Sequence, residues 1–464
     1  MIRLFDSARG EVCDLHLRDP GRVSIYVCGP TVYGPPHLGH GRFTLVWDVL
    51  RRWLTYQGLS VHFVTNITDV DDKIIARARA EGRAESAVAA ECEAEWWAAM
   101  ARLGVARPDD VPHATDYVGG MVELIEALLE HGAAYRTSDG VYFDVTSVRD
   151  YGLLAGQPLE SLRAGARVGV SDEKRSPLDF ALWKAAKPGE PSWAAPFGEG
   201  RPGWHTECVV MSLDLLGEGF DLHTGGLDLK FPHHENERAQ AVALGRSFAR
   251  HWDHNGMVVV DGEKMSKSLG NFTSLADLAA RTDPRAYRLL VLRSHYRSPL
   301  EVNPSTIADA ERALARLDAL ARRFDLAPLA GPDRLERHDR HDFAEEADDL
   351  YERVAAALND DLDTPLAVAD LFEAVTAANQ MEDEARHGPA RRLAQAVNTL
   401  FGAMGLGLRA GTDEVDDVTR RLVLERDAAR SQRRFGDADR IRDQLVERGW
   451  VVEDGPAGTV VRRA

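Results

Sequence analysis

Four side chains that can bind a metal ion are spread over three distant stretches of the sequence. Cys28 follows an apolar run, Cys208 lies far downstream, and His233 and Glu237 are four residues apart. Residues at that spacing lie one turn apart on a helix, so their side chains can converge on one ion. Two thiolates, one imidazole and one carboxylate suit Zn²⁺. The sequence has no compact Cys-x-x-Cys pair, so spacing alone does not establish a metal site. The alternative is that the cysteines are small buried residues and that the His/Glu pair lies on the surface.

Two further motifs could bind phosphate. The run His37-Leu38-Gly39-His40 precedes an expected helix, whose first amide groups and dipole favour an anion, and Gly39 leaves room for a nucleotide. Far downstream, the two lysines of Lys264-Met265-Ser266-Lys267-Ser268 could neutralise charge that develops as pyrophosphate leaves. A pair of surface histidines and an exposed basic loop are the alternatives. The order of the two motifs on one α/β scaffold favours nucleotide binding.

The two motifs resemble the HIGH and KMSKS signatures of class I aminoacyl-tRNA synthetases, with Leu38 in place of the usual Ile. This resemblance implies a Rossmann catalytic domain, ATP with Mg²⁺ bound between the motifs, and transfer to the 3′-terminal ribose of tRNA. The catalytic residues that it implies are His37, His40, Lys264 and Lys267, and the nucleotide-binding residues are Gly39, Gly226, Asp228 and Lys267.

Four longer runs, at 26–33, 66–73, 203–208 and 231–237, look like those of the cysteinyl-tRNA synthetases. The resemblance implies L-cysteine and tRNA(Cys) as substrates and places Thr68 and Trp204 in the amino-acid pocket; without it, Trp204 would be interpreted as a core aromatic residue. It also implies one zinc ion per chain, with the ligands Cys28, Cys208, His233 and Glu237. Zinc would bind a substrate thiol as thiolate, whereas the hydroxyl of serine ionises far less readily. Such discrimination makes an editing domain unnecessary.

The elements that must position these residues indicate an α/β domain. An apolar run at 23–27 predicts a buried strand, the spacing of apolar residues from 45 to 54 predicts an amphipathic helix, and 61–66 predicts a second strand. This is the parallel unit that opens a doubly wound sheet. Strand-like segments at 220–223 and 257–260 indicate that the sheet resumes. Between about 117 and 200 the pattern loosens, which predicts an insertion.

The remainder of the chain reads as helical. Apolar residues from 307 to 321 follow one helical face, and Thr364-Pro365 predicts an N-cap and first helical position. Between 420 and 448 nine arginines outnumber six acidic residues, and 450–461 is readable as a hairpin. A solvated helix with internal ion pairs is one interpretation of this basic segment. The resemblance implies that the helical bundle and the basic tail hold the anticodon stem and loop.

We therefore expect a Rossmann-type doubly wound parallel sheet with an inserted connective domain, followed by an α-helical bundle and a small C-terminal α+β domain. The expected boundaries are 1–116 for the first half of the Rossmann catalytic domain, 117–200 for the connective insertion, 201–304 for the second half with the KMSKS region, 305–404 for the tRNA-stem-binding bundle and 418–464 for the anticodon-binding domain.

Composition restricts the class of protein. The 464 residues are 44% hydrophobic and 28% charged, as in soluble globular proteins, and no long uncharged apolar run could cross a bilayer. Asp6 comes too early for a signal peptide, and four widely spaced cysteines fit a reducing compartment, so we expect a cytoplasmic protein. We also expect a monomer. The net charge of −18 disfavours nonspecific nucleic-acid binding but permits a specific RNA where arginines cluster.

Two other functions are considered: a cysteine ligase with a different acceptor, and an RNA-binding protein without catalytic activity. The mycothiol-pathway cysteine ligase shares the zinc, HIGH and KMSKS features and joins cysteine to a glucosaminyl inositol, but it lacks the tail that this chain has at 418–464. A noncatalytic RNA-binding paralogue would have lost His40, Lys267 or a metal ligand, and all are present. His234 and Asp69 are candidate site residues without an assigned role, and we expect Cys13 and Cys92 to be structural.

Overall fold

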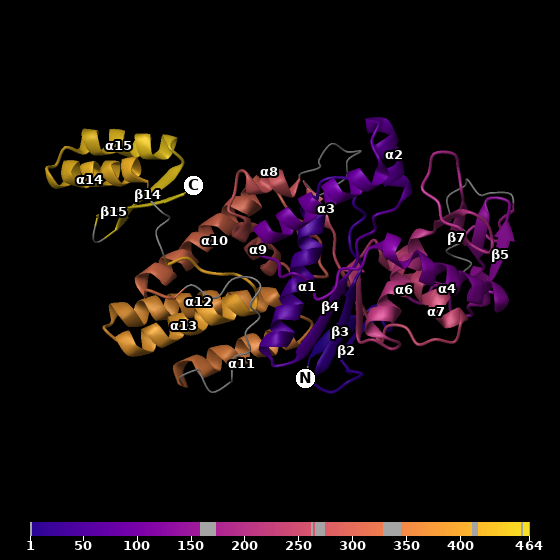
Figure 1. The fold of residues 1–464 in the computed structure, drawn as a ribbon. Helices are drawn as coiled ribbons and strands as arrows, with labels where there is room; N and C mark the ends of the chain where they lie inside the picture. Colours follow the sequence, from indigo (N-terminus) through magenta and orange to yellow (C-terminus); the bar gives the residue numbers. More distant parts are fainter. Residues whose placement is uncertain are drawn as a thin grey trace.

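The computed structural model describes residues 2–157, 173–260, 263–264, 274–327, 345–410, 416–455 and 458–463. Figure 1 shows an N-terminal unit with a central sheet, a smaller module beside it, a group of long helices, and a C-terminal unit that lies apart from the rest. Among the described helices, none has both the length and the apolar character needed to span a bilayer.

A parallel sheet forms the centre of the N-terminal unit, with the strand order β10-β9-β3-β4. Its strands are β3 (Arg22–Val27), β4 (Ser60–Thr65), β9 (Leu222–Gly226) and β10 (His251–Asn255). Every neighbouring pair is parallel, and Ile25 of β3 lies opposite Phe63 of β4 and Leu222 of β9. An antiparallel pair, β1 (Arg3–Asp6) and β2 (Glu11–Asp14), precedes this sheet in the chain.

Helices cover both faces of the parallel sheet. Ile25 and Val27 of β3 pack in one hydrophobic cluster with α1 (Leu38–Tyr56), whereas Tyr26 packs in another with α6 (Trp204–Leu216). Alternate side chains of a strand point to opposite faces, so the two helices lie on opposite sides of the sheet. The expected doubly wound parallel sheet is confirmed.

The sheet resumes with β9 and β10, and the prediction that 257–260 belongs to it is wrong. β11 (Val258–Val260) pairs instead with β12 (Glu263–Lys264) and β13 (Leu300–Glu301) in a separate three-stranded sheet. The strand β10 reads His-Trp-Asp-His-Asn, which lacks the apolar pattern of a central strand, yet all five residues are buried. Distant partners satisfy its polar groups: Tyr296, for example, donates to Asp253 at 2.9 Å.

The loosely patterned segment after the first half of the sheet forms a module of its own. Its helix is α4 (Val118–Glu130), and its antiparallel strands, in the order β5-β6-β7-β8, are Ala134–Thr137, Gly140–Phe143, Phe180–Ala185 and Gly200–Pro202. Strand β8 leads through Gly203 into α6. A Cβ atom on Gly203 would lie 1.9 Å from the carbonyl oxygen of Ala181, so only glycine allows this close passage of two backbones.

Further helices pack around the sheet and continue the chain beyond it. Those of the N-terminal unit are α2 (Asp72–Glu81), α3 (Glu85–Arg102), the π-helical turn η3 (Lys230–His234), α7 (Glu235–Ala243), α8 (Leu275–Ala279) and α9 (Pro284–Leu292), with short 3₁₀ turns at Ala114–Tyr117 and Val145–Ser147. The later ones are α10 (Pro304–Arg323), α11 (Glu345–Asn359), α12 (Thr364–Asp383) and α13 (His387–Ala403).

The start of α12 differs by one residue from the prediction. The N-cap is Asp363, whose carboxylate accepts a hydrogen bond from the backbone N–H of Leu366 at 3.0 Å, and Thr364 is already helical. Aspartate is as good an N-cap as threonine or better, so Asp363 takes the N-cap position and Thr364 does not. The expected helical region after residue 304 is otherwise confirmed.

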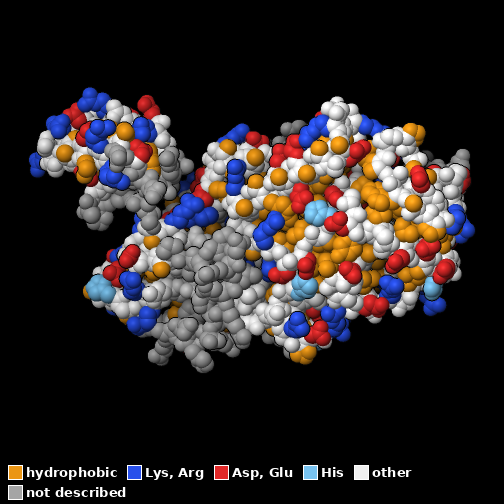
Figure 2. All heavy atoms as spheres, in the orientation of Figure 1, with side chains coloured by type: hydrophobic (Ala, Val, Ile, Leu, Met, Phe, Trp, Pro, Cys, Tyr) orange, Lys and Arg blue, Asp and Glu red, His pale blue; other side chains and the backbone are white. Residues whose placement is uncertain are grey.

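The C-terminal unit contains two helices and a hairpin. Its elements are α14 (Asp417–Ser431), α15 (Phe435–Glu447), β14 (Trp450–Gly455) and β15 (Gly458–Arg463). The two strands pair antiparallel, which confirms the predicted hairpin. Leu445, Trp450 and Val461 form its small core. Figure 2 shows many arginine side chains over the surface of this unit, which has no lysine.

A buried ion pair joins α9 to α1. Arg288 Nη1 lies 2.7 Å from Asp48 Oδ2, and the two side chains are 1% and 2% exposed. Arg288 also donates to the carbonyls of Leu103, after α3, and Met404, after α13. Burial acts to raise the pKa of Asp48, but Arg52 and Arg288 outweigh burial and hold that pKa below its ordinary value. This pair fixes the helix that begins at the HLGH motif.

Replacement of this buried cation should destabilise the whole N-terminal unit. Arg288→Met leaves the Asp48 carboxylate with one cation fewer and two carbonyls without their donor, which should lower the free energy of unfolding by about 3–5 kcal/mol. Urea denaturation followed by circular dichroism measures the change. Arg3→Met, which removes an exposed pair with Asp360, is the matched control and should change stability little. Equal losses in the two variants would contradict the prediction.

Candidate functional site

Most of the predicted site residues lie at one edge of the parallel sheet. Cys28 directly follows β3, Thr68 follows β4, and Gly226 ends β9. His37 is the N-cap of α1, in the connection that leaves β3. The carboxyl ends of parallel strands meet at the same edge, which is where open α/β sheets bind ligands.

The four predicted metal ligands come together in a buried cluster. The ligand atoms of Cys28, Cys208, His233 and Glu237 all lie within 4.8 Å of one another, and the four residues are at most 3% exposed. Cys28 Sγ lies 3.6 Å from Cys208 Sγ and 3.4 Å from Glu237 Oε1. His233 Nε2 lies 3.8 Å from Cys208 Sγ and 2.9 Å from Glu237 Oε1. His233 and Glu237 converge as their spacing predicts, although His233 belongs to η3 and the α-helix begins only at Glu235.

These distances suit a zinc ion. Zinc binds sulfur at about 2.3 Å and nitrogen or carboxylate oxygen at about 2.0–2.2 Å, so tetrahedral ligand atoms lie about 3.4–3.8 Å apart. The Cys28–Cys208, Cys28–Glu237 and Cys208–His233 distances fall in this range. The shorter His233–Glu237 distance is that of a hydrogen bond, which a shared ion would replace. The donor set and its spacing therefore fit Zn²⁺.

The members of the cluster shift one another's pKa values. Burial acts to raise the pKa of Cys208, but the Cys28 thiol donates to its sulfur and His233 lies beside it, and together they lower that pKa to about 6. Burial and Cys208 raise the pKa of Cys28 well above its ordinary value. Burial acts to lower the pKa of His233, yet Glu237 and Cys208 raise it to about 10. A metal ion that entered would displace the protons of Cys28 and His233.

Two histidines and a tryptophan flank the ligands. His205 Nδ1 lies 2.8 Å from His233 Nδ1, and His223 Nε2 lies 2.7 Å from Glu237 Oε2, so each of these two ligands is oriented by a second imidazole. The ring of Trp204 stacks on that of His233 with centroids 4.0 Å apart. Trp204 is 37% exposed, which places it at an opening beside the cluster and not in the core.

A buried chain of polar side chains runs beside the cluster. The Gly29 amide donates to Asn66 Oδ1 at 2.8 Å, Asn66 Nδ2 donates to Thr68 Oγ1 at 3.3 Å, and Thr68 Oγ1 donates to Glu207 Oε2 at 2.7 Å. Burial and the neighbouring Cys208 raise the pKa of Glu207 well above its ordinary value. Sequence reasoning missed Asn66 and Glu207. The signal that could have identified Glu207 is its position next to the proposed metal ligand Cys208.

His37 and His40 form a reciprocal cap at the start of α1. The backbone N–H of each donates to the ring of the other at 3.3 Å, and the two rings stack with centroids 3.6 Å apart. Gly39 lies between them in the first helical turn and is half-buried. The first turn of a helix presents unpaired amide groups and the positive end of its dipole. The arrangement can therefore receive an anion such as a phosphate.

The chain that follows the KMSKS motif reaches this helix start. Lys264 ends β12, opposite Val259 of β11, while Lys267 lies outside the described residues. After the motif, Ser274 forms a β-bridge with His37, and the Leu275 amide donates to the Pro36 carbonyl at 2.9 Å. The described chain that resumes at Ser274, after the motif, thus lies against the start of α1 although the two are more than 200 residues apart.

Gly226 and Asp228 lie in the turn at the end of β9. A Cβ atom on Gly226 would lie 2.7 Å from Asp228 Oδ1, so the glycine lets the carboxylate fold back over the strand end. The Leu227 amide donates to the Asn255 carbonyl at 2.8 Å, which fixes the turn against β10. Asp228 is exposed at the same edge of the sheet as Cys28.

The residues without an assigned role have structural partners. Asp69 accepts hydrogen bonds from the backbone and hydroxyl of Thr115, at 3.0 and 2.6 Å. His234 Nδ1 lies 2.9 Å from His254 Nε2, on the side of the sheet that carries α7. Cys92 is buried in α3 beside Arg77, and Cys13 is half-buried in β2 beside Arg9.

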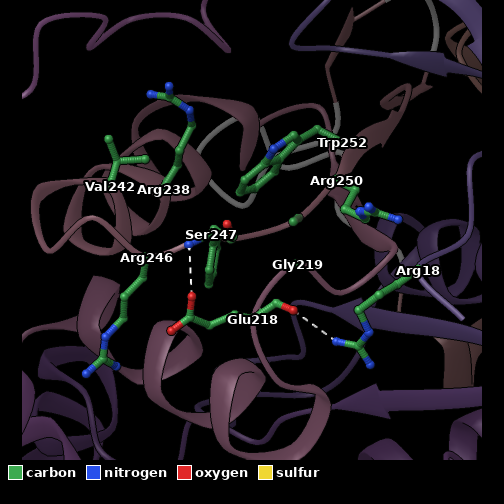
Figure 3. A pocket seen from close by; sticks show the side chains of 11 residues that line it. Arg18, Glu218, Gly219, Arg238, Val242, Arg246, Ser247, Arg250 and Trp252 are labelled. Atoms are coloured by element: carbon green, nitrogen blue, oxygen red, sulfur yellow. Dashed lines mark hydrogen bonds between the residues drawn. The ribbon is translucent and has the colours of Figure 1, made fainter.

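A pocket of about 540 Å³ lies at the opposite edge of the sheet, before the first residues of β9 and β10. The guanidinium groups of Arg238, Arg246 and Arg250 point away from its centre in different directions, while Arg18 donates to the carbonyl of Glu218 (Figure 3). None of the predicted site residues lines this pocket. It is therefore separate from the cluster and from the HLGH motif.

Comparison with known proteins adds independent findings. Residues 15–312 match the family described as tRNA synthetases class I (C) catalytic domain, and residues 353–409 match the DALR domain. The chain is 47% identical to the cysteine–tRNA ligase of Methylobacillus flagellatus over 457 residues, 96% of each chain. It is 44% identical to that of Thermotoga maritima over 465 residues, 99% of each chain.

Solved structures of related enzymes share the fold. A methionyl-tRNA synthetase of Mycobacterium tuberculosis in complex with methionyl-adenylate superposes with a TM-score of 0.60 at 18% identity, over 82% of this chain and 89% of that one. At this identity the likeness concerns the fold alone. The class I catalytic match over most of the chain, with full-length relatives at 44–47% identity, shows that the chain belongs to the cysteine–tRNA ligase family of class I tRNA synthetases.

Proposed function

We propose that the chain activates L-cysteine with ATP to cysteinyl-adenylate and transfers the cysteinyl group to the 3′-terminal ribose of tRNA(Cys). Its full-length relatives are cysteine–tRNA ligases. The observation that carries the proposal is the buried cluster of Cys28, Cys208, His233 and Glu237 at the ligand-binding edge of the sheet. One zinc ion held there would supply a Lewis acid that prefers a thiolate to a hydroxyl.

The amino-acid pocket lies beside this cluster. Trp204 stacks on the ligand His233, and Thr68 is hydrogen-bonded to Glu207, which precedes the ligand Cys208. A cysteine whose sulfur reaches the cluster would have Trp204 and Thr68 against its remaining atoms. These two residues are therefore assigned to substrate binding.

The ATP site is assigned to the start of α1 and the end of β9. His37, Gly39 and His40 would contact the phosphates, and Gly226 with Asp228 would contact the adenosine and its ribose. Lys264 and Lys267 would approach the triphosphate, which carries Mg²⁺, from the segment that returns to His37 through Ser274. The β-bridge between Ser274 and His37 supports this arrangement.

The helical bundle and the C-terminal unit would hold the tRNA. Arg421, Arg433 and Arg442 on or next to α14 and α15 are exposed and make no ion pair within the described part of the chain. Unpaired arginines on a folded unit can neutralise phosphates and release counterions. Their position on a unit apart from the catalytic edge suits a partner as long as a tRNA (Figure 1).

Loss of one sulfur should remove zinc and activity together. In Cys208→Ser a hydroxyl replaces the thiolate, so bound zinc should fall below one per chain and cysteine-dependent pyrophosphate exchange should fall more than about 100-fold. Metal analysis and the exchange assay measure the two quantities. Cys92→Ser is the matched control, because Cys92 is equally buried but lies outside the cluster. Full activity in a zinc-free Cys208→Ser protein would defeat the metal assignment.

The acceptor should be tRNA. The wild-type chain with cysteine and ATP should acylate tRNA(Cys) and leave a glucosaminyl inositol unmodified, because the chain carries a folded unit at 418–464 that the sugar ligase lacks. Radiolabelled cysteine, followed into each acceptor, measures this. Cysteine-dependent exchange with acylation of the sugar alone would assign the chain to the mycothiol-type reaction. RNA binding without exchange would indicate a noncatalytic paralogue.

Charge reversal on the C-terminal unit should affect only the second half-reaction. Arg433→Glu combined with Arg442→Glu should lower kcat/KM for tRNA by about 10-fold or more at low salt and leave pyrophosphate exchange unchanged. Arg246→Glu combined with Arg250→Glu changes the net charge equally at the opposite edge of the sheet and serves as control. Similar losses in both double variants would mean that total charge, not this unit, governs tRNA binding.

A further inference from the structure

The hydrogen-bond chain beside the metal cluster has a fixed direction. The Gly29 amide can only donate, so the atom of Asn66 that faces it at 2.8 Å is the side-chain oxygen. The Asn66 amide nitrogen then faces Thr68 Oγ1 at 3.3 Å and donates to it. The proton of the Thr68 hydroxyl is directed to Glu207 Oε2 at 2.7 Å. The chain therefore runs one way, from the end of β3 to the carboxylate.

The chain is also held in place. Asn66, Thr68 and Glu207 are each 1% exposed. A Cβ atom on Gly29 would lie 1.7 Å from the backbone oxygen of Asn66, so the two strand ends touch and only glycine fits between them. The backbone of Thr68 donates to the Pro30 carbonyl at 3.1 Å. The hydroxyl of Thr68 consequently has little freedom to turn its proton elsewhere.

One acceptor position on Thr68 remains. A hydroxyl offers one proton and two lone pairs. Glu207 takes the proton and Asn66 occupies one lone pair, so the other lone pair can receive a hydrogen bond but the hydroxyl cannot donate a second one. Any ligand group that meets Thr68 here must bring an N–H or O–H donor.

The surroundings favour a donor that carries positive charge. Within the described part of the chain Glu207 makes no ion pair; burial, Cys208 and Asp71 raise its pKa, while Thr68 and His233 act to lower that pKa. Burial thus disfavours the charged form of Glu207, and a cation bound beside it would offset that cost. A hydrogen bond to a charged donor is also about twice as strong as one between neutral groups. An ammonium group satisfies both requirements.

We propose that Glu207 is a positioning residue that makes the Thr68 hydroxyl an acceptor for the α-ammonium group of the substrate amino acid. This inference rests on the proposed function, because it assumes that the thiol of the same substrate reaches the cluster. Glu207 and Cys208 are consecutive residues of α6, so one helical turn serves both ends of the substrate. The site then selects a thiol that also bears an ammonium group.

The test compares two small thiols. Cysteamine keeps the thiol and the ammonium group of cysteine, whereas 3-mercaptopropionate keeps the thiol and lacks the ammonium group. Their inhibition constants against cysteine-dependent pyrophosphate exchange are measured with zinc-loaded enzyme. In the wild type we expect cysteamine to inhibit about 10-fold more strongly or better. In Glu207→Gln, which keeps the shape and removes the charge, this preference should shrink to within about 3-fold.

Further readouts separate positioning from a general structural role. Glu207→Gln should keep its zinc content and its KM for ATP, while its KM for cysteine rises about 10-fold or more. Thr68→Ser, which retains the hydroxyl, should keep the preference for cysteamine, and Thr68→Val should lose it. The double variant Glu207→Gln, Thr68→Val should lose no more than Thr68→Val alone, because both changes act through one hydroxyl.

Several outcomes would overturn the proposal. An unchanged preference for cysteamine in Glu207→Gln would do so, and so would an equal loss for both thiols accompanied by loss of zinc. If circular dichroism shows that Glu207→Gln does not fold, the comparison of Thr68→Ser with Thr68→Val decides. Failure of the proposed function looks different, because the wild-type chain would then show no cysteine-dependent exchange at all.

Discussion

Two sulfurs, an imidazole and a carboxylate are packed together with almost no exposure, and a bound cation would offset the cost of their burial. Water cannot solvate these groups, and protons alone leave a coupled set of thiol, thiolate and imidazolium. A metal ion bound there would replace the protons and would hold β3, α6 and the η3–α7 segment to one point. Because such a site does not exist in the unfolded chain, the free energy of metal binding would also stabilise the fold.

In a parallel sheet the carboxyl ends of all strands lie at the same edge. This cluster therefore lies next to the nucleotide motifs. The end of β3 supplies Cys28 and continues into the capping histidines of α1. The end of β9 supplies Gly226. The buried Arg288–Asp48 pair holds α1 against α9, and the bridge between Ser274 and His37 joins the chain after the second motif to the first. The proposed sites for the substrate sulfur and for phosphate thus share one rigid frame.

Sequence patterns predict those parts of the structure that local backbone geometry or apolar packing stabilises. The strands at 23–27 and 61–66 and the helix between them follow from hydrophobic spacing, and the convergence of His233 with Glu237 follows from helical geometry. The meeting of Cys28 with Cys208 depends on contacts between residues 180 positions apart, so only the family resemblance indicated it. Strand β10 escaped prediction for the same reason, since distant partners make its polar residues suitable for a core.

Glu207 shows most clearly why the rest of the site could not be predicted. An acidic residue in the first turn of a helix has an ordinary local explanation, because it interacts favourably with the helix dipole. Its role here depends on the Gly29 amide, which sets the direction of every hydrogen bond up to its carboxylate. Successive helical residues point about 100° apart, so α6 directs Cys208 to the cluster and Glu207 to Thr68. A change that rotated α6 would therefore disturb the sulfur and the ammonium contacts together, whereas a change at Gly29 or Asn66 would disturb the second without altering any metal ligand.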